Sequence, residues 1–285
     1  MTHPIIRPFK GLHPRKKHAA AVAAPPYDIV SAGEARRIAV GNPLSFLHIS
    51  RAEIDLPDEI HPYAPEVYEK AKENFDRLIF DRVLVRDTRP CYYAYRLTKD
   101  SHTQIGLVAA ASVAAYESGH IRRHELTRPE KENDRIRQID ALSAQTGPAL
   151  LVHPDDDEAE RLVAEIADGV PICDIKNRDG IRHTLWKTAD AAIHFRVEKS
   201  LGALPALYIA DGHHRTAAAA RIAAARRGAG ASDSCEYFLS VIFPARQMRI
   251  LAYNRIVHDL NGLSIAAFLE AVGRCGLVTP MSSAS

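Results

Sequence analysis

The stretch ALYIADGHHRTAAAARIAAARR, residues 206–227, decides the fold of this protein. Its apolar opening, residues 206–210, predicts a buried strand, and its alanine-rich close, residues 216–227, is typical of a strong helix. Between them stands DGHHR, residues 211–215, in which glycine permits a tight backbone turn. The stretch therefore predicts a strand that turns directly into a helix.

Such a junction aims backbone N–H groups and the positive end of the helix dipole at one place, which suits an anion. The Arg215 guanidinium can donate two hydrogen bonds to phosphate oxygens. Asp211 can hold Mg²⁺ or take a proton from a substrate hydroxyl. The simpler alternative is that Asp211 caps the helix while the histidines pack. Five non-apolar residues in a row after a buried strand favour a binding site.

A second charge-rich stretch, RHELTRPEKENDR at residues 123–135, mixes a candidate base with several cations. Glu125 is the candidate base, and Arg128, Lys131 and Arg135 are candidate phosphate ligands. Pro129 favours the start of a helix there, because proline is tolerated in a first helical turn. A solvated charged loop is the alternative.

The histidines raise the further possibility of zinc. His120 and His124 are four residues apart, and His213 and His214 follow later in the chain. The HExxH motif is absent because position 128 is arginine, and a guanidinium inside the shell of a dication is unfavourable. A zinc hydrolase is therefore a minor alternative.

A third motif, APPYD at residues 24–28, predicts a rigid turn, since each proline restricts its own backbone and its predecessor's. Tyr27 and Asp28 would then line a pocket, unless the motif is an ordinary turn.

Elsewhere strands and helices alternate, which predicts an α/β or α+β fold with a mixed sheet and flanking helices. Further strands are expected at residues 46–49, 91–97, 104–116, 149–153, 170–175, 183–187, 236–243 and 250–253. Helices are expected at residues 31–39, 63–81, 155–167 and 190–200 and after Pro129, the first of them with a capping box.

Composition limits the classes of partner. The chain has 285 residues, and 37 Lys and Arg against 35 Asp and Glu leave a net charge of +2, which gives no argument for nucleic acid. The N-terminus has no apolar core of a signal peptide, and no apolar run is long enough to span a membrane. The four cysteines form no CxxC pair and are expected to be buried thiols. We therefore expect a cytoplasmic protein.

Four motifs carry a resemblance to a widespread prokaryotic family of unknown function: PPYDIV at 25–30, NPLSFLHI at 42–49, RHELTRPEKENDR at 123–135 and YIADGHHRTAAA at 208–219. The DGHHR turn also resembles the phosphate-binding turn of the ParB/sulfiredoxin-like superfamily, one branch of which contains the free serine kinase. That resemblance implies that Asp211, His213, His214 and Arg215 serve nucleotide phosphates and metal, while a separate glutamate acts as base. Assigning that base to Glu125 is our inference.

The leading hypothesis is phosphoryl transfer from ATP or ADP, with Mg²⁺, to a small hydroxylated metabolite, most simply free serine. The alternatives are a nucleotide-responsive regulatory module of ParB type and a metal-dependent hydrolase. The expected catalytic residues are Glu125, Asp211, His213 and His214, with Asp211 also the metal ligand. The expected nucleotide-binding residues are Gly212, Arg215, Thr216, His124, Arg128, Lys131 and Arg135.

Two parts are expected along the chain. Residues 1–255 should form an α/β core that carries both charged motifs, and residues 256–285 should begin a C-terminal segment. Relatives in the resembling family run well past 285 residues, so this segment is expected to be truncated.

Overall fold

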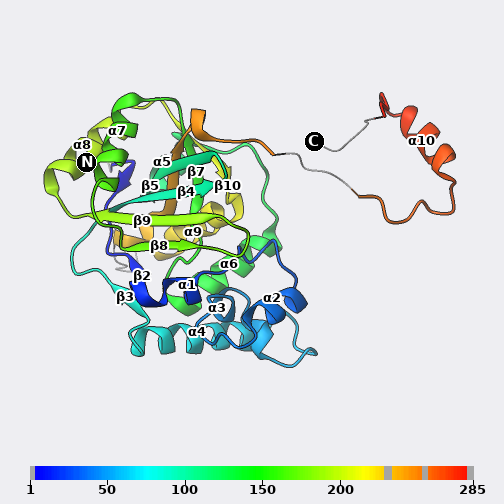
Figure 1. Ribbon diagram of the computed structural model, residues 1–285, viewed down its shortest axis with the longest axis horizontal. Helices are drawn as coiled ribbons and strands as arrows, with labels where there is room; N and C mark the ends of the chain where they lie inside the picture. Colours follow the sequence, from blue (N-terminus) through cyan, green and yellow to red (C-terminus); the bar gives the residue numbers. More distant parts are fainter. Residues whose placement is uncertain (1–3, 228–232, 252–255, 281–285) are drawn as a thin grey trace. The chain divides into compact units, whose positions relative to one another are not determined.

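A large mixed sheet contains the strand predicted at residues 206–210 (Figure 1). The computed structural model describes residues 4–227, 233–251 and 256–280. The chain divides into two compact units, Met1–Met248 and Arg249–Ser285, and the first contains the sheet.

Nine strands of the described chain form this sheet, in the order β6-β10-β7-β11-β5-β4-β9-β8 with β1 beside β5. Only β6 with β10 and β7 with β11 pair in parallel among these neighbours, so the sheet is mixed, as predicted. The strands are β1 (Ile6–Arg7), β4 (Tyr92–Lys99), β5 (His102–Ser112), β6 (Ile121–Arg122), β7 (Ala149–His153), β8 (Cys173–Lys176), β9 (Arg182–Thr188), β10 (Leu207–Asp211) and β11 (Tyr237–Pro244).

Helices cover the sheet and make its centre a buried core. Nearly every residue of β11 is buried, and successive strand residues point to opposite faces, so both faces are covered here. Helix α7 packs beside β4, β5 and β9, α8 packs against α7 and β1, and α9 packs beside β7 and β11. The helices of this part are α5 (Val113–Glu117), α6 (Pro129–Leu142), α7 (Asp157–Ala167), α8 (Ala191–Gly202) and α9 (His213–Arg226).

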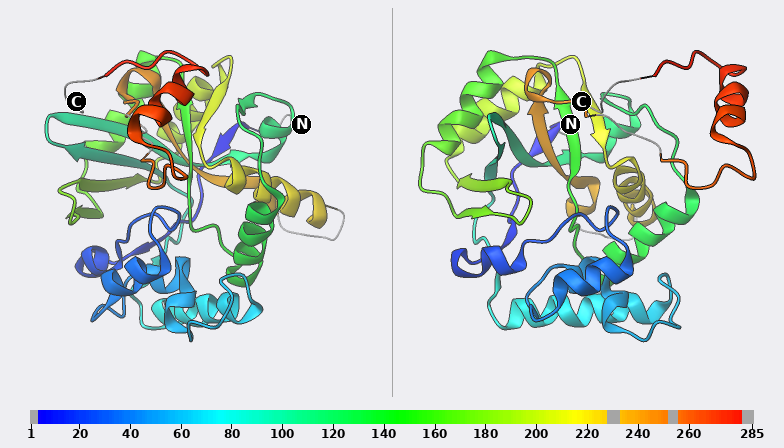
Figure 2. Two further views of the ribbon diagram at one scale, coloured as in Figure 1. Left: turned by 90° about the vertical axis from the view of Figure 1, so that its right-hand side faces the viewer. Right: turned by 45° about the vertical axis from the view of Figure 1, so that its right-hand side comes forward.

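Helices near the N-terminus form a separate layer, drawn in blue and cyan in Figure 2. Val67, Phe75 and Leu78 of the amphipathic α4 make its core, and Leu142 at the end of α6 belongs to the same cluster. Helix α6 therefore links this layer to the sheet. The layer comprises α1 (Ala19–Val22), α2 (Ala32–Ala39), α3 (Leu47–Ser50), α4 (Pro65–Phe80) and the antiparallel pair β2 (Leu12–Pro14) and β3 (Leu84–Arg86).

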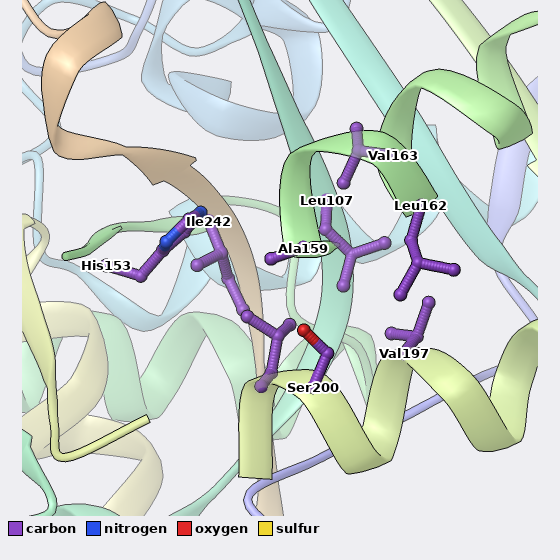
Figure 3. A pocket seen from close by; sticks show the side chains of 9 residues that line it. Leu107, His153, Ala159, Leu162, Val163, Val197, Ser200 and Ile242 are labelled. Carbon is purple, nitrogen blue, oxygen red and sulfur yellow. The ribbon is translucent and has the colours of Figure 1, made fainter. Parts of the chain in front are cut away.

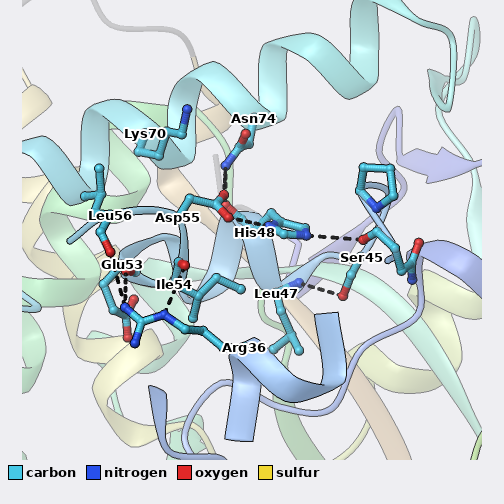
Figure 4. Close-up of polar contacts among 12 residues, drawn as sticks. Arg36, Ser45, Leu47, His48, Glu53, Ile54, Asp55, Leu56, Lys70 and Asn74 are labelled. Carbon is cyan, nitrogen blue, oxygen red and sulfur yellow. Dashed lines mark hydrogen bonds and ion pairs between the residues drawn. The ribbon is translucent and has the colours of Figure 1, made fainter. Parts of the chain in front are cut away.

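Polar side chains tie this layer together (Figure 4). Arg36 donates to the backbone carbonyls of Glu53, Ile54 and Leu56, and so fastens α2 to the turn after α3. His48 lies 2.8 Å from the Asp55 carboxylate, whose other oxygen accepts a hydrogen bond from Asn74 of α4. These contacts give the NPLSFLHI segment a structural role.

The predicted strand at residues 46–49 is wrong, because these residues form α3. A four-residue apolar run does not distinguish a strand from a helix by periodicity. Here Leu47 packs with Ala35 and Ala39, while Ile49 packs into the cluster around Phe75. Because Leu47 and Ile49 pack against two different clusters, the segment forms a helix and not a strand.

Three other boundaries differ from expectation. The strand predicted to Tyr116 ends at Ser112, whose hydroxyl caps α5 by accepting from the N–H of Ala115. The strand expected from Val170 begins instead at Cys173. The strand expected at 250–253 is not formed by residues 250–251, and residues 252–253 lie outside the described residues.

The burial of the cysteines also differs from the expectation of four buried thiols. Cys91 is buried, but Cys173 and Cys235 are half-buried and Cys275 is exposed.

The second unit contains α10 (Ile265–Gly273), capped by the Ser264 hydroxyl, which accepts from the N–H of Ala267. Within the described part of the chain, no helix is both long and apolar enough to cross a membrane.

Candidate functional site

The turn between β10 and α9 has the strained geometry that glycine allows. Gly212 has φ +95°, and a Cβ there would lie 3.1 Å from Cα of Ala149. Helix α9 begins at His213, three residues earlier than predicted, because Gly212 itself occupies the N-cap position. No side chain caps this 14-residue helix and no acidic residue stands in its first turn. Its N-terminus is therefore suited to an anion.

Arg215 lies across this turn. Its guanidinium donates to the Asp211 carboxylate at 2.6 Å and also to the carbonyl oxygen of Pro148. The Asp211 side chain is 66% exposed, whereas that of Arg215 is 20% exposed. The predicted phosphate ligand is thus held in place by a carboxylate and by the loop before β7.

The structure brings the two charged motifs together. The rings of His124 and His213 meet edge to face with centroids 4.5 Å apart, and Glu125 lies 3.4 Å from Nδ1 of His213. The backbone N–H of Arg128 donates to Nε2 of His214 at 3.1 Å. The parallel pairing of β6 with β10 explains the meeting, because it carries the residues that follow each strand to the same edge.

The hydrogen bonds assign the state of both histidines in the turn. Nε2 of His213 lies 3.5 Å from the backbone N–H of His124, and Nε2 of His214 accepts from Arg128. Each Nε2 is therefore an acceptor and each proton sits on Nδ1, which in His213 faces the Glu125 carboxylate.

Burial lowers the pKa of His213 below its ordinary value of 6.5, and the nearby His124 lowers it further. The carboxylates of Glu125 and Asp211 act in the opposite direction but do not restore it. Only 4% of the His213 side chain is exposed, against 58% for Glu125. A buried neutral imidazole thus lies behind a carboxylate that is exposed to solvent.

Helix α6 holds the charged loop against α9. Arg221 of α9 forms an ion pair with Glu132 at 3.0 Å, and the Thr127 hydroxyl donates to the same carboxylate. Although burial alone would raise the pKa of Glu132, the bonds from Thr127 and Arg221 lower it. Sequence reasoning did not assign a role to Glu132 or Arg221, and only the charge of the segment signalled them.

On its other side α6 meets the N-terminal motif. The Arg135 guanidinium lies 4.0 Å above the Tyr27 ring and donates to the Asp134 carboxylate at 3.0 Å. The Tyr68 hydroxyl donates to the other oxygen of Asp134 at 2.9 Å. Burial raises the pKa of Tyr27, which also senses the charge of Arg215. The PPYD turn therefore lies beside Arg135 of the second charged motif, while the lining of a pocket by Tyr27 and Asp28 stays a prediction.

Besides Arg135, two further predicted nucleotide ligands are bound to other groups of the protein. Lys131 donates to the Tyr63 hydroxyl at 2.9 Å, on the side of the N-terminal layer. Thr216 is fully buried, and its hydroxyl donates to the carbonyl oxygen of His213. In this structure Thr216 stabilises the first turn of α9 from inside.

The residues present limit what a metal ion would find. Within the described residues, no three His, Cys, Asp or Glu side chains are grouped for a metal ion. Asp211 supplies one carboxylate, already paired with Arg215. A divalent cation here would need further oxygen ligands from a bound molecule.

A separate cavity lies in the core beside β5, α7 and α8 (Figure 3). Its two polar side chains are engaged: His153 Nδ1 lies 2.6 Å from the carbonyl oxygen of Pro154, and the Ser200 hydroxyl donates to Asp156 at 3.4 Å. The other lining residues are apolar: Leu107, Ala159, Leu162, Val163, Val197, Leu201 and Ile242. This cavity belongs to the core and not to the charged site.

Comparison with known proteins gives one match. Neither the curated proteins nor the solved structures include a match to this chain. A family model described as protein of unknown function (DUF1015) matches residues 6–284. The chain therefore belongs to this family of proteins of unknown function, DUF1015.

Proposed function

We propose that this protein is a nucleotide-dependent phosphotransferase that acts on a small hydroxylated metabolite, most simply free serine. The observation that carries the proposal is the meeting of residues 123–128 with the turn at residues 211–215, through His124 on His213 and Arg128 on His214. Phosphoryl transfer needs cations and N–H groups around phosphate together with a base near the accepting hydroxyl. At this edge of the sheet the first turn of α9 and Arg215 would serve the phosphate, and the Glu125 carboxylate would serve as the base.

The phosphates would bind at the N-terminus of α9. Its first turn offers backbone N–H groups, and Arg215 stands beside them. Arg128 adds an exposed guanidinium, which forms no ion pair within residues 4–227, 233–251 and 256–280. The likeness of DGHHR to the phosphate-binding turn of the ParB/sulfiredoxin-like superfamily supports the same placement.

Glu125 would be the base. Its carboxylate is exposed, and its distance of 3.4 Å to Nδ1 of His213 lets the buried imidazole orient it. An oriented carboxylate can accept the proton of a substrate hydroxyl as that oxygen attacks phosphorus. His213 would then be a positioning residue, and Glu125 the group that touches substrate.

Mg²⁺ fits this site in a restricted way. Proteins often hold Mg²⁺ by one or two carboxylates together with the phosphates of the substrate. Asp211 supplies one exposed carboxylate beside the N-terminus of α9, and would hold the ion. When bound, Mg²⁺ would neutralise negative charge on the phosphates.

The test is direct. The purified chain is incubated with ATP or ADP, Mg²⁺ and a panel of serine, threonine, homoserine and glycerol, and products are followed by ³¹P NMR and mass spectrometry. We expect a phosphorylated product from at least one acceptor. No product, together with no nucleotide binding by calorimetry, would overturn the proposal.

The same assay separates the regulatory alternative. Nucleotide binding without turnover would favour a module of ParB type, and filter binding of DNA at low salt would then test it, because phosphate contacts are strongest there. A nucleotide-using enzyme of this kind would act in the cytoplasm.

A further inference from the structure

A surface hollow adjoins the charged site on the side of β6. It lies where α5 turns into β6, and its volume is about 510 Å³. This size falls in the range of small-ligand sites. The lining residues are Tyr116, Glu117, Gly119, Ile121, Arg122 and Arg123.

The pairing of β6 with β10 sets the position of the hollow relative to the turn. Arg122 is the register partner of Tyr208, and Gly212 follows Tyr208 by four residues along β10. At 3.3 Å per strand residue that is roughly 13 Å. This span is of the order of that between the base and the terminal phosphate of an extended nucleotide. His124, which touches His213, directly follows the hollow in the chain.

The side chains of the hollow suit a flat aromatic group. The Arg122 guanidinium lies 5.6 Å from the centre of the Tyr208 ring, and the Arg123 guanidinium lies 5.9 Å from that of Tyr116. Neither guanidinium forms an ion pair in the part of the chain that the structure describes. Planar guanidinium groups stack on π systems, and both arginines are exposed.

Glu117 and the backbone of β6 are also suited to a bound nucleobase. Glu117 already has a cationic partner, because its carboxylate pairs at 3.0 Å with Arg227, which also pairs with Glu236 at 2.8 Å. Strand β6 is at the end of the sheet order, and an edge strand presents unpaired backbone N–H and C=O groups on its outer side. Such groups can hydrogen-bond the edge of a nucleobase.

We propose that the hollow formed by residues 116–123 binds the base of the nucleotide whose phosphates lie at the N-terminus of α9, an inference that rests on the proposed function. The base stacks on the guanidinium groups of Arg122 and Arg123. The hollow thus makes the site selective for a nucleotide over inorganic polyphosphate.

The test compares ADP with inorganic pyrophosphate, both with Mg²⁺, by calorimetry. The double variant R122K/R123K keeps both charges but removes the planar groups, and Tyr208→Ser removes a ring without changing charge. A base that stacks on these planar groups loses that contact in R122K/R123K, so we expect ADP to bind roughly tenfold more weakly to this variant. Binding to Tyr208→Ser should also weaken, because that variant loses the ring beside the Arg122 guanidinium. Pyrophosphate affinity should stay at the wild-type level. Arg178→Lys, at an exposed turn residue between β8 and β9, is the control and should change neither.

The other outcomes distinguish a failure of this inference from a failure of the proposed function. If both ligands keep wild-type affinity in the variants, or if both weaken equally, the base lies elsewhere and this inference is wrong while the phosphate site stands. If the wild-type chain binds neither ligand, the proposed function itself fails. Photolabelling with 8-azido-ADP gives a second measurement, since labelled peptides should come from residues 116–123 and not from the N-terminal layer.

Discussion

His213 meets His124 edge to face with ring centroids 4.5 Å apart, although 89 residues separate them in the chain. The contact places a buried imidazole behind the exposed Glu125 carboxylate. It also explains why burial and a neighbouring imidazole both lower the pKa of His213.

Protonation of His213 should destabilise the fold. Its pKa is lowered in the native state from an ordinary value of 6.5, so just below that pH the unfolded chain binds more protons than the native one. The stabilising contribution is therefore complete above about pH 6.5 and is lost as pH falls toward the native pKa. In urea denaturation between about pH 5 and pH 7, His213→Gln should show a smaller loss of stability on acidification than wild type.

The matched control for this titration is His102→Gln, which removes a half-buried imidazole outside the site. A wild-type chain whose unfolding free energy stays constant over this pH range would contradict the prediction. So would an equal loss of stability in the wild type and in His213→Gln.

Glu125→Gln should remove turnover and leave nucleotide binding intact. Glutamine keeps the shape of the side chain but cannot accept the hydroxyl proton, and general base catalysis typically contributes about 10²–10⁴ in rate. We expect kcat to fall by roughly this factor, with the ADP dissociation constant unchanged. Glu130→Gln, in the exposed first turn of α6, is the control and should retain activity. Equal kcat values for the two variants would exclude Glu125 as the base.

Gly212→Ala should damage both stability and the site. The residue has φ +95°, and the new Cβ would lie 3.1 Å from Cα of Ala149 and 3.2 Å from Cζ of Arg215. Left-handed strain with this crowding should lower the unfolding free energy by about 1–3 kcal/mol and weaken nucleotide binding by displacing Arg215.

Gly202→Ala provides the comparison for that substitution. Gly202 ends α8, and a Cβ there meets nothing within 4 Å. Alanine should stabilise this position or leave it unchanged. If thermal unfolding shows equal midpoints for the two variants, the constraint on Gly212 is absent.

Asp134→Asn should destabilise the link between α6 and the N-terminal layer. The carboxylate is 8% exposed and accepts from Tyr68 and from two nitrogens of Arg135, at 3.0 and 2.5 Å. Neutralising it leaves a mostly buried guanidinium without its partner, which typically costs about 3–5 kcal/mol. Urea denaturation measures the loss.

The control for this charge removal is Asp140→Asn, also on α6. Its carboxylate pairs with Arg226 at the surface, where both side chains are about half exposed. Exposed pairs contribute about 0–1 kcal/mol, so stability should hardly change. A loss in Asp134→Asn no larger than in this control would show that Asp134 is not structurally important.

Local signals predicted many elements well. Helix α2 follows Ser31 with the expected capping box, in which the Glu34 side chain and the Ser31 hydroxyl bond each other's backbone N–H groups. Strand β7 has the bounds predicted for residues 149–153. Capping and an alternating apolar pattern involve only a few neighbouring residues, so they can be recognised in the sequence. The strand predicted at residues 46–49 is wrong because the conformation around Leu47 depends on packing against distant helices.

Sequence alone determined the strand, the glycine turn and the helix of residues 206–227, because backbone preference and helix propensity are local properties. It also marked residues 123–135 as chemically rich. Tertiary structure decided that Arg128 reaches His214, that Arg135 lies on Tyr27, and that Lys131 and Thr216 are engaged elsewhere. These contacts join residues far apart in the chain. They arise from strand pairing and from the packing of α6 between two layers, which no local pattern encodes.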